Sequence, residues 1–140
     1  MVDHAGPVSN EHSRAIPEAI NAAYGTMQLD VITAVGGGAS GAFPYVVQIG
    51  DRRSLVRIEG PASPLRNPHQ YASMRIAAAA GIAPRLHHVD ESARVAVMDF
   101  VEERPLASFP GGPSGLARAV GTMLRRLHAT TPFPAFVEYP

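Results

Sequence analysis

The sequence contains no cysteine, which excludes disulfide bonds and thiolate metal sites. It has no apolar run of transmembrane length, and its first residues lack the apolar core of a signal peptide. Its 12 basic residues balance its 12 acidic residues, so no charge excess predicts binding to nucleic acid or to an anionic membrane. Together these absences predict a cytoplasmic protein that has neither a nucleic-acid nor a membrane partner.

The most informative stretch is 31–60, which predicts three short strands at 31–35, 43–49 and 54–58. Between the first two strands, residues 36–41 include four glycines. Such a turn lets the backbone approach a ligand closely and direct its N–H groups toward an anion.

The glycine-rich turn also matches the pattern G-x-G-x-x-G, which several architectures share. A Rossmann fold needs a helix directly after the glycines, but Phe43 opens a run that favours a strand. A P-loop needs Lys and Ser or Thr where Ala42 and Phe43 stand. A glycine-rich hairpin followed by a strand with a basic residue is typical of kinases. The alternative is a tight hairpin without a ligand, and the glycines alone do not decide between the two.

The remaining segments complete an α+β pattern. Two further strands are predicted at 85–89 and 94–101, and three helices at 13–24, 68–80 and from Ser114 onward. This order predicts an antiparallel five-stranded sheet with one packed helix, plus flanking N- and C-terminal helices. Adjacent His87 and His88 would point to opposite faces of a strand, so they predict no metal site.

Several segments, taken together and in this order, resemble the N-terminal lobe of the choline kinase and aminoglycoside phosphotransferase family, a branch of the protein-kinase-like fold. The segments are the glycine-rich turn with 45–47, the basic strand 54–58, the helix 70–75 with its GIAP turn at 81–84, the strand and hinge 97–106, and the LRRLH helix at 124–128.

The resemblance implies an ATP site. It implies that the backbone of the glycine-rich turn covers the triphosphate, that Arg57 pairs with the phosphates, and that Met98 backs the adenine pocket. It also implies that backbone groups of Asp99 and Val101 bind the adenine edge. The turn residues concerned are Gly37, Gly38, Ala39, Ser40 and Gly41.

One departure from the family concerns the carboxylate that orients the strand cation. The family places a glutamate on the helix, but Gln70 stands there, and 65–80 contains no acidic residue. Gln70 can accept a hydrogen bond from Arg57, which is weaker than a carboxylate contact. Alternatively, Gln70 completes a capping box with Asn67.

The second departure concerns catalysis. The family's catalytic loop H-x-D-x-x-x-x-N and its later metal-binding aspartate do not occur in this sequence, so we expect no catalytic residue and no metal site in it. The predicted division is a flexible segment 1–12, a nucleotide-binding lobe 13–102, and a hinge with the first helix of a missing lobe at 103–140. Mg²⁺ is expected only with that missing lobe.

Two functions follow as hypotheses. The first is the ATP-binding lobe of a small-molecule kinase that moves the γ-phosphate of ATP to a hydroxyl. On this hypothesis the chain is a fragment or one half of a split enzyme, paired with a complementary C-lobe chain and inactive alone. The alternative is a degenerate kinase-like lobe that serves as a non-enzymatic interaction module or homo-oligomer.

Overall fold

The computed structural model describes residues 8–36, 41–62, 64 and 66–135. The chain forms two compact units: unit 1 comprises Met1–Asn67 and Leu86–Phe100, and unit 2 comprises Pro68–Arg85 and Val101–Pro140. Among the described residues, five strands and the first helix lie in unit 1, and two α-helices and a short 3₁₀ helix lie in unit 2. The predicted domain limits at residues 13 and 103 stay a prediction.

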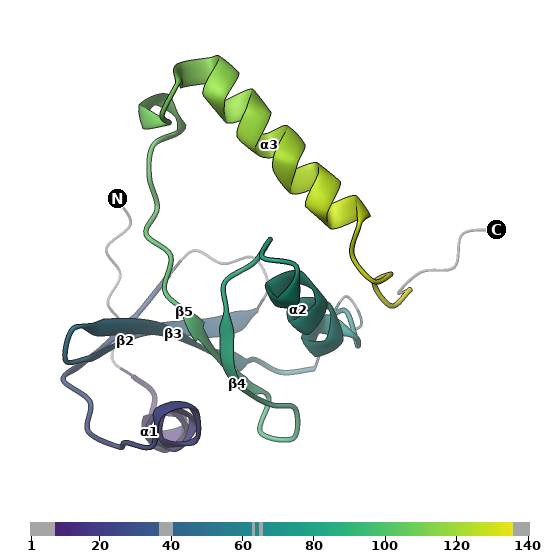
Figure 1. The fold of residues 1–140 in the computed structure, drawn as a ribbon. Helices are drawn as coiled ribbons and strands as arrows, with labels where there is room; N and C mark the ends of the chain where they lie inside the picture. Colours follow the sequence, from purple (N-terminus) through teal and green to yellow (C-terminus); the bar gives the residue numbers. More distant parts are fainter. Residues whose placement is uncertain (1–7, 37–40, 63, 65, 136–140) are drawn as a thin grey trace. The chain divides into compact units, whose positions relative to one another are not determined.

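A five-stranded antiparallel sheet is the frame of unit 1 (Figure 1). Its spatial order is β1-β2-β3-β5-β4, which puts β3 at the centre, paired with β2 and β5. The strands are β1 (Val31–Ala34), β2 (Ala42–Ile49), β3 (Arg52–Glu59), β4 (Leu86–Asp90) and β5 (Val95–Asp99). The predicted α+β fold with an antiparallel five-stranded sheet is therefore confirmed.

Helix α1 (Asn10–Tyr24) covers one face of this sheet. Ile16 and Ile20 are fully buried together with Val47, Val56 and Val97 from three strands, which form the core of the unit. Within unit 1 the packed helix is thus α1, which the sequence predicts only as a flanking helix.

The start of α1 lies three residues before the predicted position because Ser9 caps it. The Ser9 hydroxyl accepts a hydrogen bond from the backbone N–H of His12 at 3.2 Å. His12 then joins the helix to the sheet, since its Nδ1 lies 2.6 Å from the Tyr45 hydroxyl. Burial of this tyrosine raises the pKa of its phenol.

Unit 2 holds α2 (Gln70–Ala79), a short 3₁₀ helix (Leu106–Ser108) and α3 (Gly112–His128). The prediction that Asn67 caps α2 is wrong, because Pro68 and His69 form a turn and His69 takes the N-cap position. The capping-box alternative for Gln70 is wrong for the same reason. Likewise α3 begins at Gly112 rather than after Ser114, with a proline in its first turn.

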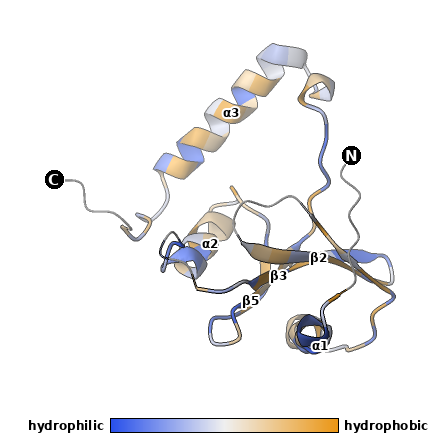
Figure 2. Cartoon of the chain, turned by 180° about the vertical axis from the view of Figure 1, so that it is seen from behind, coloured by the Kyte–Doolittle hydropathy of each residue, from blue (hydrophilic) through white to orange (hydrophobic). Residues whose placement is uncertain are grey.

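Helix α3 is largely exposed. None of its residues, all of which the structure describes, is buried. Its exposed large apolar side chains recur at helical spacing, so apolar bands alternate with polar ones along it (Figure 2). They are Val120, Met123, Leu124 and Leu127, which we call the α3 stripe. No helix in the described part of the chain is long and apolar enough to span a membrane.

Candidate nucleotide-binding site

Strand β3 carries Arg57 and Glu59 on the sheet face opposite α1. Side chains alternate between faces along a strand, and Val56 and Ile58 belong to the core beneath α1. Leu55, Arg57 and Glu59 therefore lie on the other face, which we call the second face.

Glu59 lies between two arginines at the end of β3. Its Oε1 accepts a hydrogen bond from Nη1 of Arg57, and its Oε2 lies 3.3 Å from Nε of Arg66. The Glu59 side chain is 1% exposed, whereas Arg57 is 21% and Arg66 15% exposed. We call these three residues the Glu59 cluster. It carries one carboxylate and two guanidinium groups, so its formal net charge is positive.

The glycine-rich turn ends directly against this cluster. A side chain on the buried Gly60 would overlap the carbonyl oxygen of Gly41, so only glycine fits there. Gly41 has φ +67°, a conformation that favours glycine. Nη1 of Arg66 donates to the Gly60 carbonyl at 2.9 Å. The end of the turn, the end of β3 and two guanidinium groups thus meet at one place.

Next to this cationic end, the second face is apolar. Leu55 pairs with Val46 of β2 and with Met98 of β5, and it lies one pleat, about 6.7 Å, from Arg57 along β3. Farther along, a cavity of about 400 Å³ opens in unit 1. Its lining comprises Val31, Thr33, Val46, Gln48, Arg53 and Phe100. The second face therefore offers a cationic end with apolar side chains next to it, a combination that suits an anion joined to a flat apolar ring.

The hinge residue Asp99 ends β5. Its carboxylate lies 2.6 Å from Nε2 of His87, on the neighbouring strand β4. His87 also lies 5.1 Å from the Tyr24 ring, between ring centres. These contacts hold the side chain of Asp99 beside β4.

Unit 1 brings together only part of the predicted site. Gly41, Arg57 and Met98 all lie there, and Arg57 and Met98 share the second face. Val101 and Gln70 belong to unit 2. The roles assigned to these residues stay predictions. Gly37, Gly38, Ala39 and Ser40 lie outside the described residues.

Sequence reasoning missed Glu59 and Arg66. A local signal existed for Glu59, because residues 57 and 59 of one strand share a face, so an arginine and a glutamate two apart are neighbours. Arg66 gave no such signal. Its approach to Glu59 depends on the path of the chain between β3 and α2, which no periodic pattern specifies.

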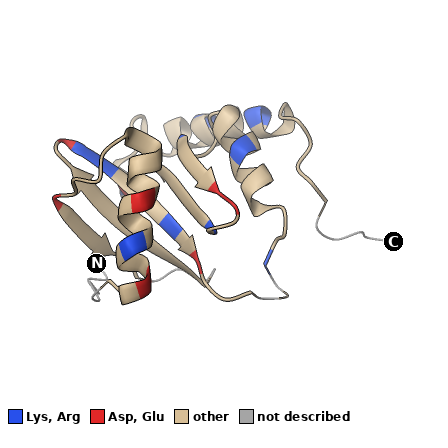
Figure 3. Cartoon of the chain, turned by 90° about the horizontal axis from the view of Figure 1, so that it is seen from below, with Lys and Arg blue, Asp and Glu red and all other residues tan. Residues whose placement is uncertain are grey.

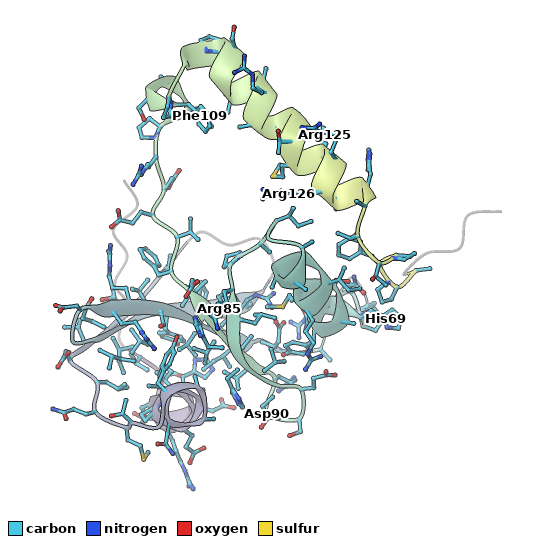
Figure 4. All side chains as sticks on the ribbon, viewed as in Figure 1. His69, Arg85, Asp90, Phe109, Arg125 and Arg126 are labelled. Atoms are coloured by element: carbon cyan, nitrogen blue, oxygen red, sulfur yellow. The ribbon has the colours of Figure 1, made fainter. Side chains whose placement is uncertain are left out.

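Two other features bear on function. No group of three potential metal-ligating side chains gathers among the described residues. Within unit 2, a larger cavity of about 780 Å³ lies between the turn at 81–84 and α3. Its lining includes Ile82, Pro84, Val101, Met123 and Arg126. Figure 4 shows Arg125 and Arg126 projecting from α3.

Comparisons with known proteins show which family and which solved structures this chain resembles. A family model described as "Phosphotransferase enzyme family" matches residues 31–139. No curated protein matches the sequence significantly. Among solved structures, a choline/ethanolamine kinase family protein from Mesorhizobium loti is similar over 90% of this chain and 42% of its own, with a TM-score of 0.60 and 23% identity. The choline kinase from Streptococcus pneumoniae is similar over 67% and 32%, with a TM-score of 0.53 and 14% identity.

The chain therefore spans less than half the length of either solved kinase. What it shares with them is the fold of a protein-kinase-like N-terminal lobe.

Proposed function

Because the chain belongs to the phosphotransferase enzyme family, we propose that it forms the ATP-binding lobe of a kinase that transfers the γ-phosphate of ATP to a hydroxyl of a small molecule. The observation that supports this most is the position of Arg57. It lies on the central strand of the sheet, partly exposed, beside the end of the glycine-rich turn and one pleat from an apolar surface.

In this proposal the second face binds the nucleotide along β3. The adenine packs on Leu55 and Met98, and its edge meets backbone groups of Asp99 and Val101. The triphosphate extends toward Arg57, whose planar guanidinium suits phosphate oxygens. Backbone N–H groups of the turn, at Gly37, Gly38, Ala39, Ser40 and Gly41, cover the phosphates.

The proposal assigns binding, and no proton transfer, to this chain. Phosphoryl transfer needs a residue that accepts the proton of the hydroxyl and Mg²⁺ that neutralises the phosphates. We propose that both belong to protein beyond these residues, either in a longer chain or in a complementary C-lobe chain. The 140-residue chain alone then binds ATP without turning it over.

Calorimetric titration of the chain with ATP tests this function. We expect saturable binding, and we expect Arg57→Ala to weaken it about tenfold or more, because a charge-assisted contact to phosphate is lost. Arg52→Ala is the matched control: Arg52 lies on the same strand, but its guanidinium stacks on Tyr24 at 4.4 Å and not on the second face. Absence of saturable binding at millimolar ATP, or equal losses in the two variants, would contradict the proposal.

A second candidate function is a kinase-like interaction module, and the exposed α3 stripe favours it. Sedimentation at increasing protein concentration tests this second function. If the stripe mediates self-association, Met123→Ser with Leu127→Ser should raise the dissociation constant about tenfold, because apolar area is no longer buried. Ala117→Ser, on an exposed position of the same helix, should leave it unchanged. A monomer at all concentrations would count against this function.

A further inference from the structure

Glu59 is a buried carboxylate at the end of a central strand, and such a group needs a structural or functional reason. An ionised carboxylate shielded from water is costly unless charges and hydrogen bonds compensate it. Here Arg57 donates a hydrogen bond to Oε1, and Arg66 forms an ion pair with Oε2, which has no hydrogen-bond partner of its own among the described residues. The chain contains no lysine, so its permanently charged basic side chains are all arginines.

The backbone around Glu59 leaves its position little freedom. Its N–H donates to the carbonyl of Arg94 at 2.9 Å, and it pairs with Ala42 at the start of β2. The next carbonyl, that of Gly60, accepts from Arg66 at 2.9 Å and from Arg94 at 3.3 Å. The carboxylate is thus anchored at the point where the glycine-rich turn rejoins the sheet.

Arg57 retains hydrogen-bonding capacity in this arrangement. A guanidinium has five N–H donors, and the contact with Glu59 uses Nη1. The side chain remains 21% exposed, so part of it is open to a ligand on the second face. Pairing with Glu59 therefore restricts the orientation of the Arg57 guanidinium without occupying all of its N–H donors.

Every member of the Glu59 cluster belongs to unit 1, whereas Gln70 and the whole of α2 belong to unit 2. We propose that Glu59 is the positioning residue that orients Arg57 toward phosphate, in the role that the family resemblance assigns to a helix carboxylate. The consequence is that the cation is aligned within unit 1 alone and does not depend on α2. This inference rests on the proposed ATP site.

The experiment compares four variants of the full 140-residue chain, titrated with ATP and with adenosine. Glu59→Gln should weaken ATP binding about tenfold and leave adenosine binding unchanged, because only the phosphate-facing cation loses its orientation. Gln70→Ala and Gln70→Glu should change both affinities less than twofold. Glu18→Gln, which removes an exposed carboxylate on α1, controls for loss of charge.

Several results would overturn the inference. One is a tenfold loss of ATP affinity in Gln70→Ala. This measurement tests the inference even if Glu59→Gln does not fold. Equal losses for ATP and adenosine in Glu59→Gln would show a general structural role. Tighter ATP binding in that variant would show that the carboxylate competes with phosphate.

A second readout separates this inference from the proposed function. In the ligand-free chain, the Nε–H resonance of Arg57 in a ¹⁵N NMR spectrum should shift in Glu59→Gln and stay in place in Gln70→Ala. If the unmodified chain binds no ATP, the proposed function fails, and the positioning role fails with it even where the NMR shift shows the ion pair. If ATP binds and the resonance moves in Gln70→Ala instead, the function stands and the inference alone fails.

Discussion

The two compact units of this chain differ in whether their apolar side chains are buried or exposed. In the described part of the chain, every buried apolar side chain except Tyr71 belongs to unit 1. Most of the large apolar side chains left exposed, including the α3 stripe, belong to unit 2. Unit 1 thus encloses a core, whereas unit 2 presents apolar surface that a further layer of protein could cover.

The two units also differ in how their charged side chains are arranged. Helix α3 carries Arg118, Arg125 and Arg126 and no acidic residue (Figure 3). In unit 1 the arginine at the proposed phosphate site is paired with a buried carboxylate. We propose that this pairing preorganises unit 1 for a ligand. The surface of α3, by contrast, is suited to a macromolecular neighbour, which we propose to be the remainder of a kinase.

The largest expected effect tests whether stability resides in unit 1. Ile20→Ala removes a fully buried side chain between α1 and the sheet, so the free energy of unfolding should fall by about 2–5 kcal/mol. Leu124→Ala in the α3 stripe should change it by less than about 0.5 kcal/mol, because that side chain is exposed. Urea denaturation followed by circular dichroism measures both. Similar losses of unfolding free energy in the two variants would contradict the expected difference between the units.

A pair of glycine substitutions should have opposite signs in the two units. Gly60→Ala places a methyl group against the Gly41 carbonyl and within 3.3 Å of the Phe43 ring, and should destabilise unit 1 by about 1–3 kcal/mol. Gly121→Ala lies within α3 with nothing within 4 Å, and should stabilise that helix by about 0.5–1 kcal/mol.

Thermal unfolding reports both changes, and the helical signal near 222 nm reports the second directly. Stabilisation by Gly60→Ala would show that the glycine-rich turn does not pack against β3 as described. A loss of helix in Gly121→Ala would show that α3 depends on contacts that its exposure does not indicate.

The sheet could be predicted from sequence because its signals are local. Alternating apolar residues and short turns define each strand within a few residues, and the register then follows. The errors fall at strand and helix ends. The sequence pattern predicts Arg94 as the first residue of the fifth strand, but its φ of 56° places it in the β4–β5 hairpin, and β5 begins at Val95.

The candidate site was only partly predictable, and for a physical reason. Arg57 could be identified from its strand and the turn before it. The pairing of Glu59 with Arg66 joins the end of β3 to a residue in the connection to α2. Likewise, the link between His12 and Tyr45 spans 33 positions of sequence. Contacts of this kind depend on tertiary structure, so no pattern in a single sequence predicts them.

The smallest expected effect concerns the loss of stability at acidic pH, which we expect in unit 1. Asp90 lies at the hairpin between β4 and β5 (Figure 4). Its carboxylate accepts hydrogen bonds from the Ser92 hydroxyl at 2.6 Å and from the Ser92 and Ala93 N–H groups at 2.9 Å. The Ser92 hydroxyl foremost, with the Ala93 N–H, lowers the pKa of Asp90 in the folded state.

A lowered folded-state pKa means that Asp90 stabilises the fold above its unfolded pKa of about 3.9, and that this contribution is lost as pH falls through the folded value. Asp90→Ala should therefore be less stable than the unmodified chain at pH 7, and the difference should shrink toward pH 3. Because α3 has no acidic residue, the loss should appear in amide exchange of the β4–β5 hairpin before that of α3. A stability difference that stays constant between pH 7 and pH 3 would show that the hairpin does not depend on the ionised carboxylate.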